Sequence, residues 1–130
     1  PAGADSIALL HRRQYASNAG QATEDESGLN LHKSLLFTMD RSNLSDIKKI
    51  HAFFNYMTAR YAGWVTIKIG ALLQQQTITT ADTSYAYTVF TFDVSALADL
   101  AKYSVDLYLT HFGPAPFFVR NNWFSIWIEE

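Results

Sequence analysis

Two segments near the C-terminal end of the chain alternate regularly between side chains that face opposite ways, and this pattern predicts strands of a sheet. In residues 104–110 (SVDLYLT), Val105, Leu107 and Leu109 share one face, which is the two-residue period of a half-buried strand. In residues 123–128 (WFSIWI), both faces carry apolar or aromatic side chains. This strand is therefore predicted to lie deep in a sheet with something covering each side. The loop between the two segments, GPAPFFVRNN, suits binding better than catalysis.

Other segments favour the same all-β architecture. Residues 64–69 (WVTIKI) and 85–94 alternate in the same way, and the chain also becomes strand-like from Leu29. Residues 95–103 are compatible with one or two helical turns capped by Ser95, or with a loop that crosses between sheets. Several short strands at this spacing predict an antiparallel jelly-roll β-sandwich of about eight strands.

Residues 44–61 fit two interpretations. Leu44, Ile47, Ile50, Phe54 and Met57 have helical spacing, whereas Ile50, Ala52, Phe54 and Tyr56 alternate as in a strand. The aromatic content and the neighbouring strands favour the strand, but periodicity leaves the helix open.

The first 28 residues differ from the rest. After a short apolar segment, the stretch SNAGQATEDESG is small, polar and acidic, which is typical of a mobile loop or arm. We therefore expect a flexible or extended N-terminal arm over residues 1–28 and a jelly-roll domain over residues 29–130.

Composition narrows the classes of partner. The chain of 130 residues has a net charge of -2 and no large basic block, so nucleic acid is not an expected partner. The longest charge-free stretches, residues 69–81 and 107–119, are shorter than the ~18 apolar residues of a membrane span, so no membrane insertion is expected. Aromatic residues make up 15% of the chain, which leaves ring area for contact with a ligand or a neighbouring subunit.

The order of three segments resembles a known family. Asp93–Ser95, then Val105–Leu109, then a closing strand from Trp123 to Ile128 is similar to the C-terminal half of family 6 carbohydrate-binding modules and their galactose-binding-like jelly-roll relatives. The middle of the chain, residues 44–57 followed by GWVTIKIG, is also similar to the family's paired strands, so the resemblance covers residues 29–128. It implies a non-catalytic glycan-binding domain.

The resemblance also implies positions for a sugar site. A ring that stacks on the sugar corresponds to Tyr85, and Arg120 or Asn121 stands where the family has an asparagine. Flat rings cover the apolar face of a pyranose, and amide or guanidinium groups bond adjacent hydroxyls. These positions lie on two loops, and we include further residues of the same loops. The predicted ligand-binding residues are Tyr85, Tyr87, His111, Phe117, Arg120, Asn121 and Asn122. The chain departs from the family at Arg120 and in lacking the family's N-terminal glutamate pair around residues 6–10.

No catalytic residue, metal site or cofactor is predicted. The chain contains no Gly-x-Ser-x-Gly elbow, P-loop or HExxH motif, and its four histidines form no zinc-ligand spacing. Calcium at Glu24, Asp25 and Glu26, together with Asp106 or Asp40, is left open beside the simpler interpretation of a solvated acidic loop.

Two hypotheses about function follow. The first is an extracellular glycan-binding attachment module that uses loop aromatic and polar side chains. The alternative is a self-assembling or decorating structural protein of a virus particle, located at the virion surface, with residues 1–28 as an arm and its aromatic surface as a subunit interface. Homo-oligomers are compatible with both.

Overall fold

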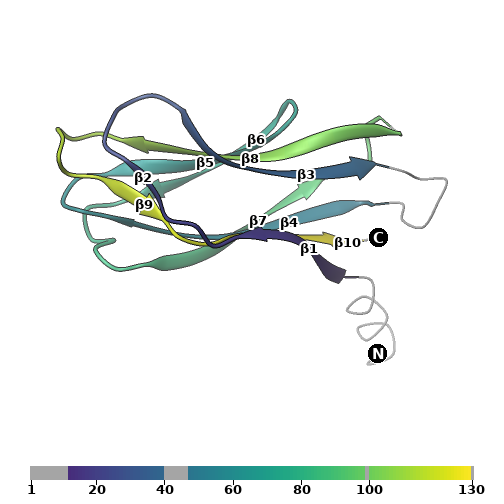
Figure 1. Cartoon of the computed structure of the whole chain (residues 1–130), viewed down its shortest axis with the longest axis horizontal. Helices are drawn as coiled ribbons and strands as arrows, with labels where there is room; N and C mark the ends of the chain where they lie inside the picture. The colour runs from purple at the N-terminus through teal and green to yellow at the C-terminus, as the bar shows by residue number, and fades with distance from the viewer. Residues whose placement is uncertain (1–11, 40–46, 99, 130) are drawn as a thin grey trace.

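The computed structural model describes residues 12–39, 47–98 and 100–129, which form two antiparallel sheets packed face to face (Figure 1). The first sheet has the order β1-β10-β4-β9-β2, and β7 pairs with the other edge of β4; the second has the order β3-β8-β5-β6. This arrangement confirms the antiparallel jelly-roll β-sandwich. The strands are β1 (Arg12–Asn18), β2 (Ala22–Glu24), β3 (Asn30–Met39), β4 (Lys49–Thr58), β5 (Gly63–Ile69), β6 (Leu72–Ile78), β7 (Ala86–Asp93), β8 (Ala101–His111), β9 (Val119–Asn121) and β10 (Phe124–Glu129).

The core lies between the two sheets and follows from the alternation of the strands. One face of each central strand turns inward, and these side chains are almost entirely buried. From the first sheet the core takes Ile50, Ala52, Phe54, Phe124, Ile126 and Ile128, and from the second it takes Phe37, Val65, Ile67, Ile69, Val105, Leu107 and Leu109.

Residues 49–58 form strand β4, so the strand interpretation of this segment is confirmed. β4 pairs with β10 along one edge, with β7 along the other, and with β9 beyond the end of β10. These neighbours give its backbone groups ladder partners on both sides, which outweighs the helical spacing of its apolar residues. Residues 44–46 lie outside the described part of the chain.

Residues 95–98 form a turn rather than a helix, and β8 begins at Ala101. Asp93 Oδ1 accepts hydrogen bonds from the main-chain nitrogen of Ser95 at 3.0 Å and from its hydroxyl at 2.6 Å. These bonds lower the pKa of the Asp93 carboxyl group. The side chain of Asp93 therefore stabilises the turn that connects the two sheets. This agrees with the expected alternative of a loop that crosses between sheets.

The sandwich begins earlier than residue 29. Strand β1 pairs with β10 from Arg12 to Asn18, and β2 pairs with β9 from Ala22 to Glu24. The polar composition that predicted an arm is explained by the position of both strands at sheet edges, where Gln14, Ser17, Asn18 and Thr23 are exposed. For residues 12–24 the predicted arm is thus replaced by two strands, and residues 1–11 lie outside the described part.

Strand β10 is central, as predicted, but only one of its faces is covered by the other sheet. Phe124, Ile126 and Ile128 point into the core, whereas Trp127 faces outward and is partly exposed. Ser125 lies on the same outward face but is 0% exposed, so this face is covered at Ser125 and partly open at Trp127. The expectation of a cover on each side is therefore met only in part, and the outward ring becomes a candidate contact surface.

Candidate functional site

The register of the first sheet brings outward-facing side chains of three strands together. Phe53 of β4 lies directly opposite Val89 of β7 and Ser125 of β10, and opposite residues in antiparallel strands share a face. Two residues further along β4, Asn55 lies opposite Tyr87. The outer face of this sheet is thus built from the odd-numbered residues of β4, β7 and β10.

Four aromatic rings cluster on this outer face. The ring centroids of Trp123 and Tyr87 are 5.9 Å apart, those of Trp123 and Phe53 are 6.4 Å apart, and those of Phe53 and Trp127 are 6.2 Å apart. Such spacings are favourable for tilted and edge-on ring pairs. We call Phe53, Tyr87, Trp123 and Trp127 the aromatic platform.

The aromatic platform borders an open depression of about 400 Å³. Tyr87 is 67% exposed, and Val89 at the side of the depression is 42% exposed. The side chains that line the depression carry rings, methyl groups and two hydroxyl groups, and no carboxylate; they belong to Phe53, Tyr87, Thr88, Val89 and Trp123. The surface therefore suits a flat, partly apolar ligand.

Asn55 holds the segment that carries Trp123. Its Oδ1 accepts hydrogen bonds from the main-chain nitrogen atoms of Asn122 at 2.9 Å and Trp123 at 3.1 Å, and its Nδ2 donates to Oδ1 of Asn122. Asn55 is fully buried although it lies on the outward-facing side of β4. It therefore fixes the β9–β10 connection and with it the orientation of the Trp123 ring.

Asn121 is also structural. Its side chain is 0% exposed, and its Nδ2 donates to the main-chain oxygen atoms of Asn55 at 2.7 Å and Trp123 at 2.9 Å. Its Oδ1 accepts a hydrogen bond from Lys33 Nζ at 2.7 Å. All polar groups of this amide are occupied, so the ligand role predicted for Asn121 does not fit its position. The neighbouring Asn122 is half-buried beside the platform, and its ligand role stays a prediction.

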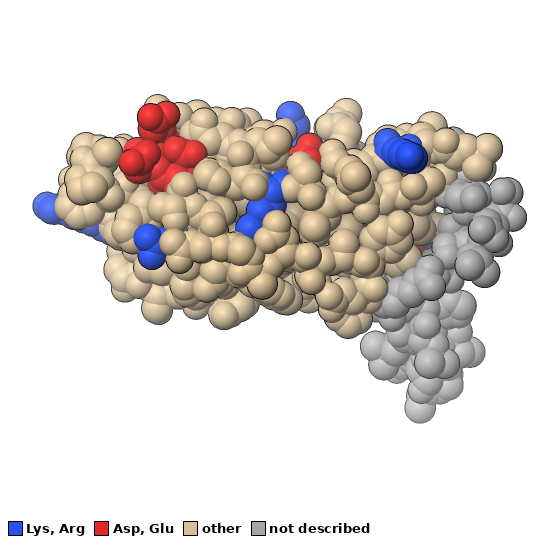
Figure 2. Space-filling view, in the orientation of Figure 1, with Lys and Arg blue, Asp and Glu red and all other residues tan. Residues whose placement is uncertain are grey.

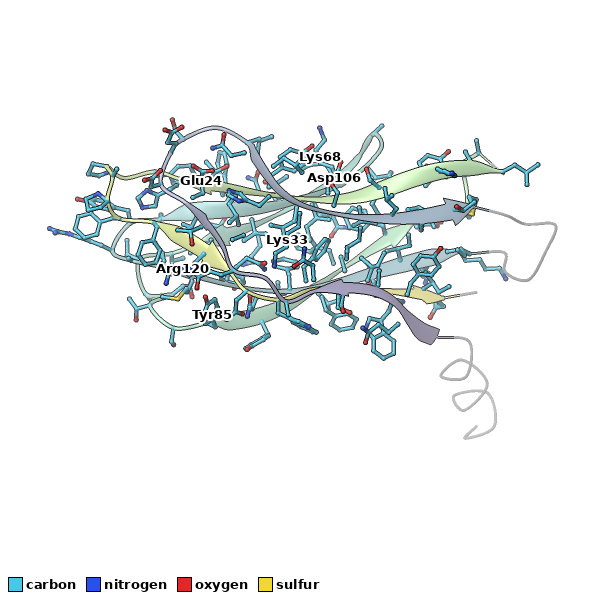
Figure 3. All side chains as sticks on the ribbon, in the orientation of Figure 1. Glu24, Lys33, Lys68, Tyr85, Asp106 and Arg120 are labelled. Atoms are coloured by element: carbon cyan, nitrogen blue, oxygen red, sulfur yellow. The ribbon has the colours of Figure 1, made fainter. Side chains whose placement is uncertain are left out.

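Lys33 enters the space between the sheets, as Figure 3 shows. Lys33 has the same parity on β3 as the buried residues Leu35 and Phe37, so the alternation of the strand turns it inward. A register shift lies immediately before it, between Leu31 and Lys33. Besides its bond to Asn121, Nζ donates to the main-chain oxygen of Asn18 at 3.1 Å. Burial lowers the pKa of Lys33 to about 8.

Arg120 lies on the same face as the aromatic platform, toward the end of the sandwich. It is directly opposite Met57 of β4 and Thr23 of β2, and its Nε donates to Thr23 Oγ1 at 3.1 Å. The guanidinium carbon lies 3.9 Å from the ring centroid of Phe118, a cation–π contact. Arg120 is thus held in place from two sides.

Tyr85 lies beside Arg120 at the same end of the sandwich (Figure 3). Burial raises the pKa of Tyr85, while the nearby guanidinium of Arg120 acts in the opposite direction. The structure therefore brings together Tyr85 and Arg120, with Tyr87 on the adjoining platform. A ligand role for these three residues stays a prediction.

His111 and Phe117 lie in a different environment. His111 is 0% exposed at the end of β8, and its ring packs edge-on against Tyr61 with centroids 5.9 Å apart. Phe117 contacts the same Tyr61 ring at 5.5 Å and lies under the guanidinium of Arg60 at 5.2 Å. The burial of His111 does not fit the predicted contact with a ligand, and Phe117 belongs to this separate cluster of rings.

The acidic loop uses the carboxylate of Glu24 within the protein. Glu24 Oε1 accepts from the main-chain nitrogen atoms of Asp25 at 3.2 Å and Glu26 at 3.1 Å, and Oε2 lies 2.9 Å from His32 Nε2. Asp106, a further candidate calcium ligand, accepts from Ser34 Oγ at 2.7 Å, and Asp40 lies outside the described residues. Within residues 12–39, 47–98 and 100–129, no group of three or more acidic, histidine or cysteine side chains could hold a metal ion.

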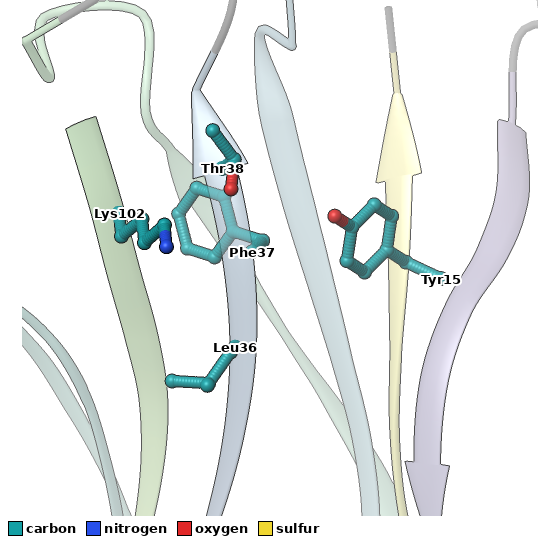
Figure 4. Close-up of a pocket in the computed structure, with 5 residues that line it drawn as sticks. All are labelled: Tyr15, Leu36, Phe37, Thr38 and Lys102. Carbon is teal, nitrogen blue, oxygen red and sulfur yellow. The ribbon is translucent and has the colours of Figure 1, made fainter. Parts of the chain in front are cut away.

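A second depression of about 240 Å³ lies between the edges of the two sheets (Figure 4). Tyr15 faces Phe37 across it, and Leu36, Thr38 and Lys102 complete its lining. It opens where β3 ends, immediately before residues 40–46, which are not described.

In the described part of the chain, no helix is long and apolar enough to cross a membrane.

Comparison with solved structures finds carbohydrate-binding modules. A family 4 module is 13% identical with a TM-score of 0.52, and the match covers 98% of this chain and 83% of that chain. The second module of family 6 from Cellvibrio mixtus lichenase 5A, solved with cellotriose, is 12% identical with a TM-score of 0.49 and coverage of 92% of each chain. The C-terminal family 6 module of the laminarinase LamC from Zobellia galactanivorans is 13% identical with a TM-score of 0.46, covering 90% of this chain and 93% of that chain.

No protein-family model matches the chain, and no curated protein is similar enough to count as a match. The likeness to the family 4 module at 13% identity is a likeness of fold. The protein is thus a β-sandwich with the architecture of a carbohydrate-binding module.

Proposed function

We propose that the protein is a non-catalytic module that binds glycans on the aromatic platform, and that it acts outside the cell, where polysaccharides are exposed. The observation that carries the proposal is the outward cluster of Phe53, Tyr87 and Trp123 around an open depression. An aromatic ring can cover the apolar C–H face of a pyranose while the sugar hydroxyls stay in water or bond to neighbouring side chains.

The placement of the rings on strands supports this function. Phe53 and Tyr87 belong to paired strands β4 and β7, and Trp123 is fixed by the hydrogen bonds of Asn55 to the chain around it. Rings that are already in place lose little conformational freedom when a ligand binds. Because a glycan loses freedom of its own on binding, a preorganised surface is an advantage for this class of ligand.

The chemistry of the depression supports binding rather than hydrolysis. Most glycosidases need two carboxyl groups on either side of the scissile bond, about 5 to 9.5 Å apart. The five residues that line the depression include no carboxylate. The nearest acid on the outer face of β10 is Glu129, which lies 3.9 Å from Lys49 Nζ and 3.7 Å from His51 Nε2.

Removal of single platform rings tests the proposal. Tyr87→Ala and Trp123→Ala are compared with the unchanged protein on a glycan array and by calorimetric titration with the best oligosaccharide. We expect each change to weaken binding by about fivefold or more, because a stacked ring contributes about 1 kcal/mol or more. Phe112→Ala is the matched control, since Phe112 is 48% exposed and packs on Trp64 of the other sheet.

Two results would overturn the proposal. One is full glycan affinity in both platform variants. The other is an unchanged protein that binds no glycan but forms oligomers that Tyr87→Ala dissociates, which would make the platform a contact between subunits.

A further inference from the structure

The cation next to the aromatic platform has no counter-charge, and this determines which glycans fit. Arg120 shares the outer face of the first sheet with Phe53, because Met57, its partner in β4, lies four residues further along that strand. Four residues of strand span about 13 Å. A polysaccharide lying along β4 over the platform would therefore reach Arg120.

The guanidinium of Arg120 is only partly used by the protein. A guanidinium has five N–H donors, and in the described part of the chain only Nε of Arg120 has an acceptor, Thr23 Oγ1. No described carboxylate lies within ion-pair distance of it. The outer fork of the side chain is thus left for a ligand, and such a fork fits a carboxylate or sulfate group through two parallel hydrogen bonds.

The acidic residue of the paired strand β2, Glu24, turns away from Arg120. Arg120 and Thr23 face outward, whereas the next residue of β2, Glu24, faces the opposite side, as alternation requires. There it lies 2.9 Å from His32. Figure 2 shows acidic atoms gathered over β2, and Figure 3 shows Glu24 near the second sheet while Arg120 and Tyr85 lie on the first.

The side chain is also held in position for binding. The face of the guanidinium rests on the Phe118 ring at 3.9 Å, and Nε is tied to Thr23 at 3.1 Å. Stacking and one hydrogen bond fix the plane of the fork, so that less side-chain freedom is lost when the remaining donors bind. The Tyr85 phenol beside it adds a hydroxyl group at the same place.

From these observations we infer that the ligand of the aromatic platform is an acidic polysaccharide, whose carboxylate or sulfate groups bind the free fork of Arg120. This inference rests on the proposed glycan-binding function. The net charge of the chain is -2, so attraction of an anionic glycan comes from this local cation and not from the protein as a whole. The resulting affinity should fall with rising salt, because the guanidinium is partly exposed to solvent.

Matched pairs of glycans test the inference. Polygalacturonate is compared with its methyl-esterified form, in which the carboxylates are neutral, and a sulfated galactan is compared with its desulfated form. We expect the unchanged protein to bind the acidic member of at least one pair about tenfold or more tightly than the neutral member. The pair that shows the preference tells whether the group is a carboxylate or a sulfate.

Variants then assign the preference to Arg120. Arg120→Gln should remove the preference for the acidic member, while Arg120→Lys, which keeps the charge without the fork, should retain part of it. Lys68→Gln is the charge-matched control, because Lys68 lies on the second sheet over the Tyr108 ring at 5.7 Å. Thermal melting of each variant verifies that it folds, and Arg120→Lys serves as the test if Arg120→Gln does not.

The outcomes separate this inference from the proposed function. Equal binding of acidic and neutral glycans, or a preference that survives both Arg120 substitutions, would overturn the acidic ligand while the glycan-binding function stands. If the unchanged protein binds none of the four test glycans and no glycan of the array, both the acidic ligand and the glycan-binding function are overturned.

Discussion

The side-chain amide of Asn121 donates to the main-chain oxygen of Asn55 at 2.7 Å, and through this bond the short strand β9 is fastened to the central strand β4. The same amide reaches the main-chain oxygen of Trp123 and accepts from Lys33. One buried side chain thus connects both sheets to the segment that presents Trp123.

Asn121→Ala should therefore destabilise the fold strongly. The change removes three hydrogen bonds in a buried place. It leaves Lys33 Nζ with the main-chain oxygen of Asn18 as its remaining acceptor, and the main-chain oxygen of Trp123 with the main-chain nitrogen of Asn55 as its remaining donor. We expect the free energy of unfolding to fall by about 3 kcal/mol or more, measured by urea denaturation. Asn30→Ala is the control, because the Asn30 amide only makes 3.4 Å contacts at the surface; a loss of comparable size in both variants would contradict the role of Asn121.

Lys33 should make stability depend on pH in the alkaline range. Its pKa is about 8 in the folded protein and 10.5 for an ordinary lysine, so between these values the unfolded chain binds more protons than the folded one. Stability contributed by this group therefore rises with pH across that window, by at most about 1.4 kcal/mol per pH unit.

The measurement compares urea unfolding of the unchanged protein and Lys33→Met from pH 7 to pH 11. Lys33→Met lacks the titrating group. The unfolding free energy of the unchanged protein should therefore rise relative to that of Lys33→Met as pH rises from 8 to 10.5. A constant difference would mean that Lys33 keeps an ordinary pKa.

Gly63→Ala should be among the most destabilising single changes in the chain. A Cβ at this position would lie 2.2 Å from the main-chain oxygen of Thr110 and 2.7 Å from a methyl carbon of Val119. The oxygen belongs to the neighbouring strand β8 and cannot move aside without breaking the β5–β8 ladder. We expect a loss of about 3 kcal/mol or more in unfolding free energy.

Gly28→Ala provides a contrast to this change. A Cβ at position 28 would meet no atom within 4 Å, but the alanine would have to adopt a φ of +96°. A cost of about 1 kcal/mol is expected from the backbone alone. Equal losses in the two variants would show that contact with Thr110 is not what makes Gly63 necessary.

Arg120→Gln should raise the pKa of Tyr85 further, independently of any ligand. The guanidinium favours the negatively charged phenolate, and its removal leaves burial as the main influence. Titration by NMR of protein with ¹³Cζ-labelled tyrosine, assigned with Tyr85→Phe, measures this shift. Lys68→Gln should leave the Tyr85 titration unchanged, and no shift in Arg120→Gln would mean that the two side chains are not neighbours.

The sequence alone predicted the sandwich because its strands alternate so clearly. In β5 and β8 the buried residues Val65, Ile67, Leu107 and Leu109 are the same ones that periodicity assigned to one face. Strands β1 and β2 were missed because edge strands with exposed side chains have the composition of a loop. Their partners, β10 and β9, lie about a hundred residues away in the chain, which no local pattern reveals.

The candidate site was predicted only in part. Tyr87 and Arg120 were identified, but Trp123 and Trp127 were expected to be covered, since a strand with two apolar faces normally has two covers. Phe53 was not singled out. Only the register that places Phe53 opposite Ser125 and Val89 shows that these rings share an outward face. Asn121 and His111 were selected for their chemistry, whereas their burial depends on tertiary contacts.

The double pairing of β4 has a consequence for recognition. Because β4 is joined to β7 on one edge and to β10 on the other, Phe53 cannot change its position without disturbing two ladders at once. A surface anchored in this way cannot reshape itself around different ligands. For the proposed glycan ligand, part of the selectivity would therefore come from fit to a surface of fixed shape: polymers with a different twist or spacing of their units would be rejected by mismatch and not accommodated by movement.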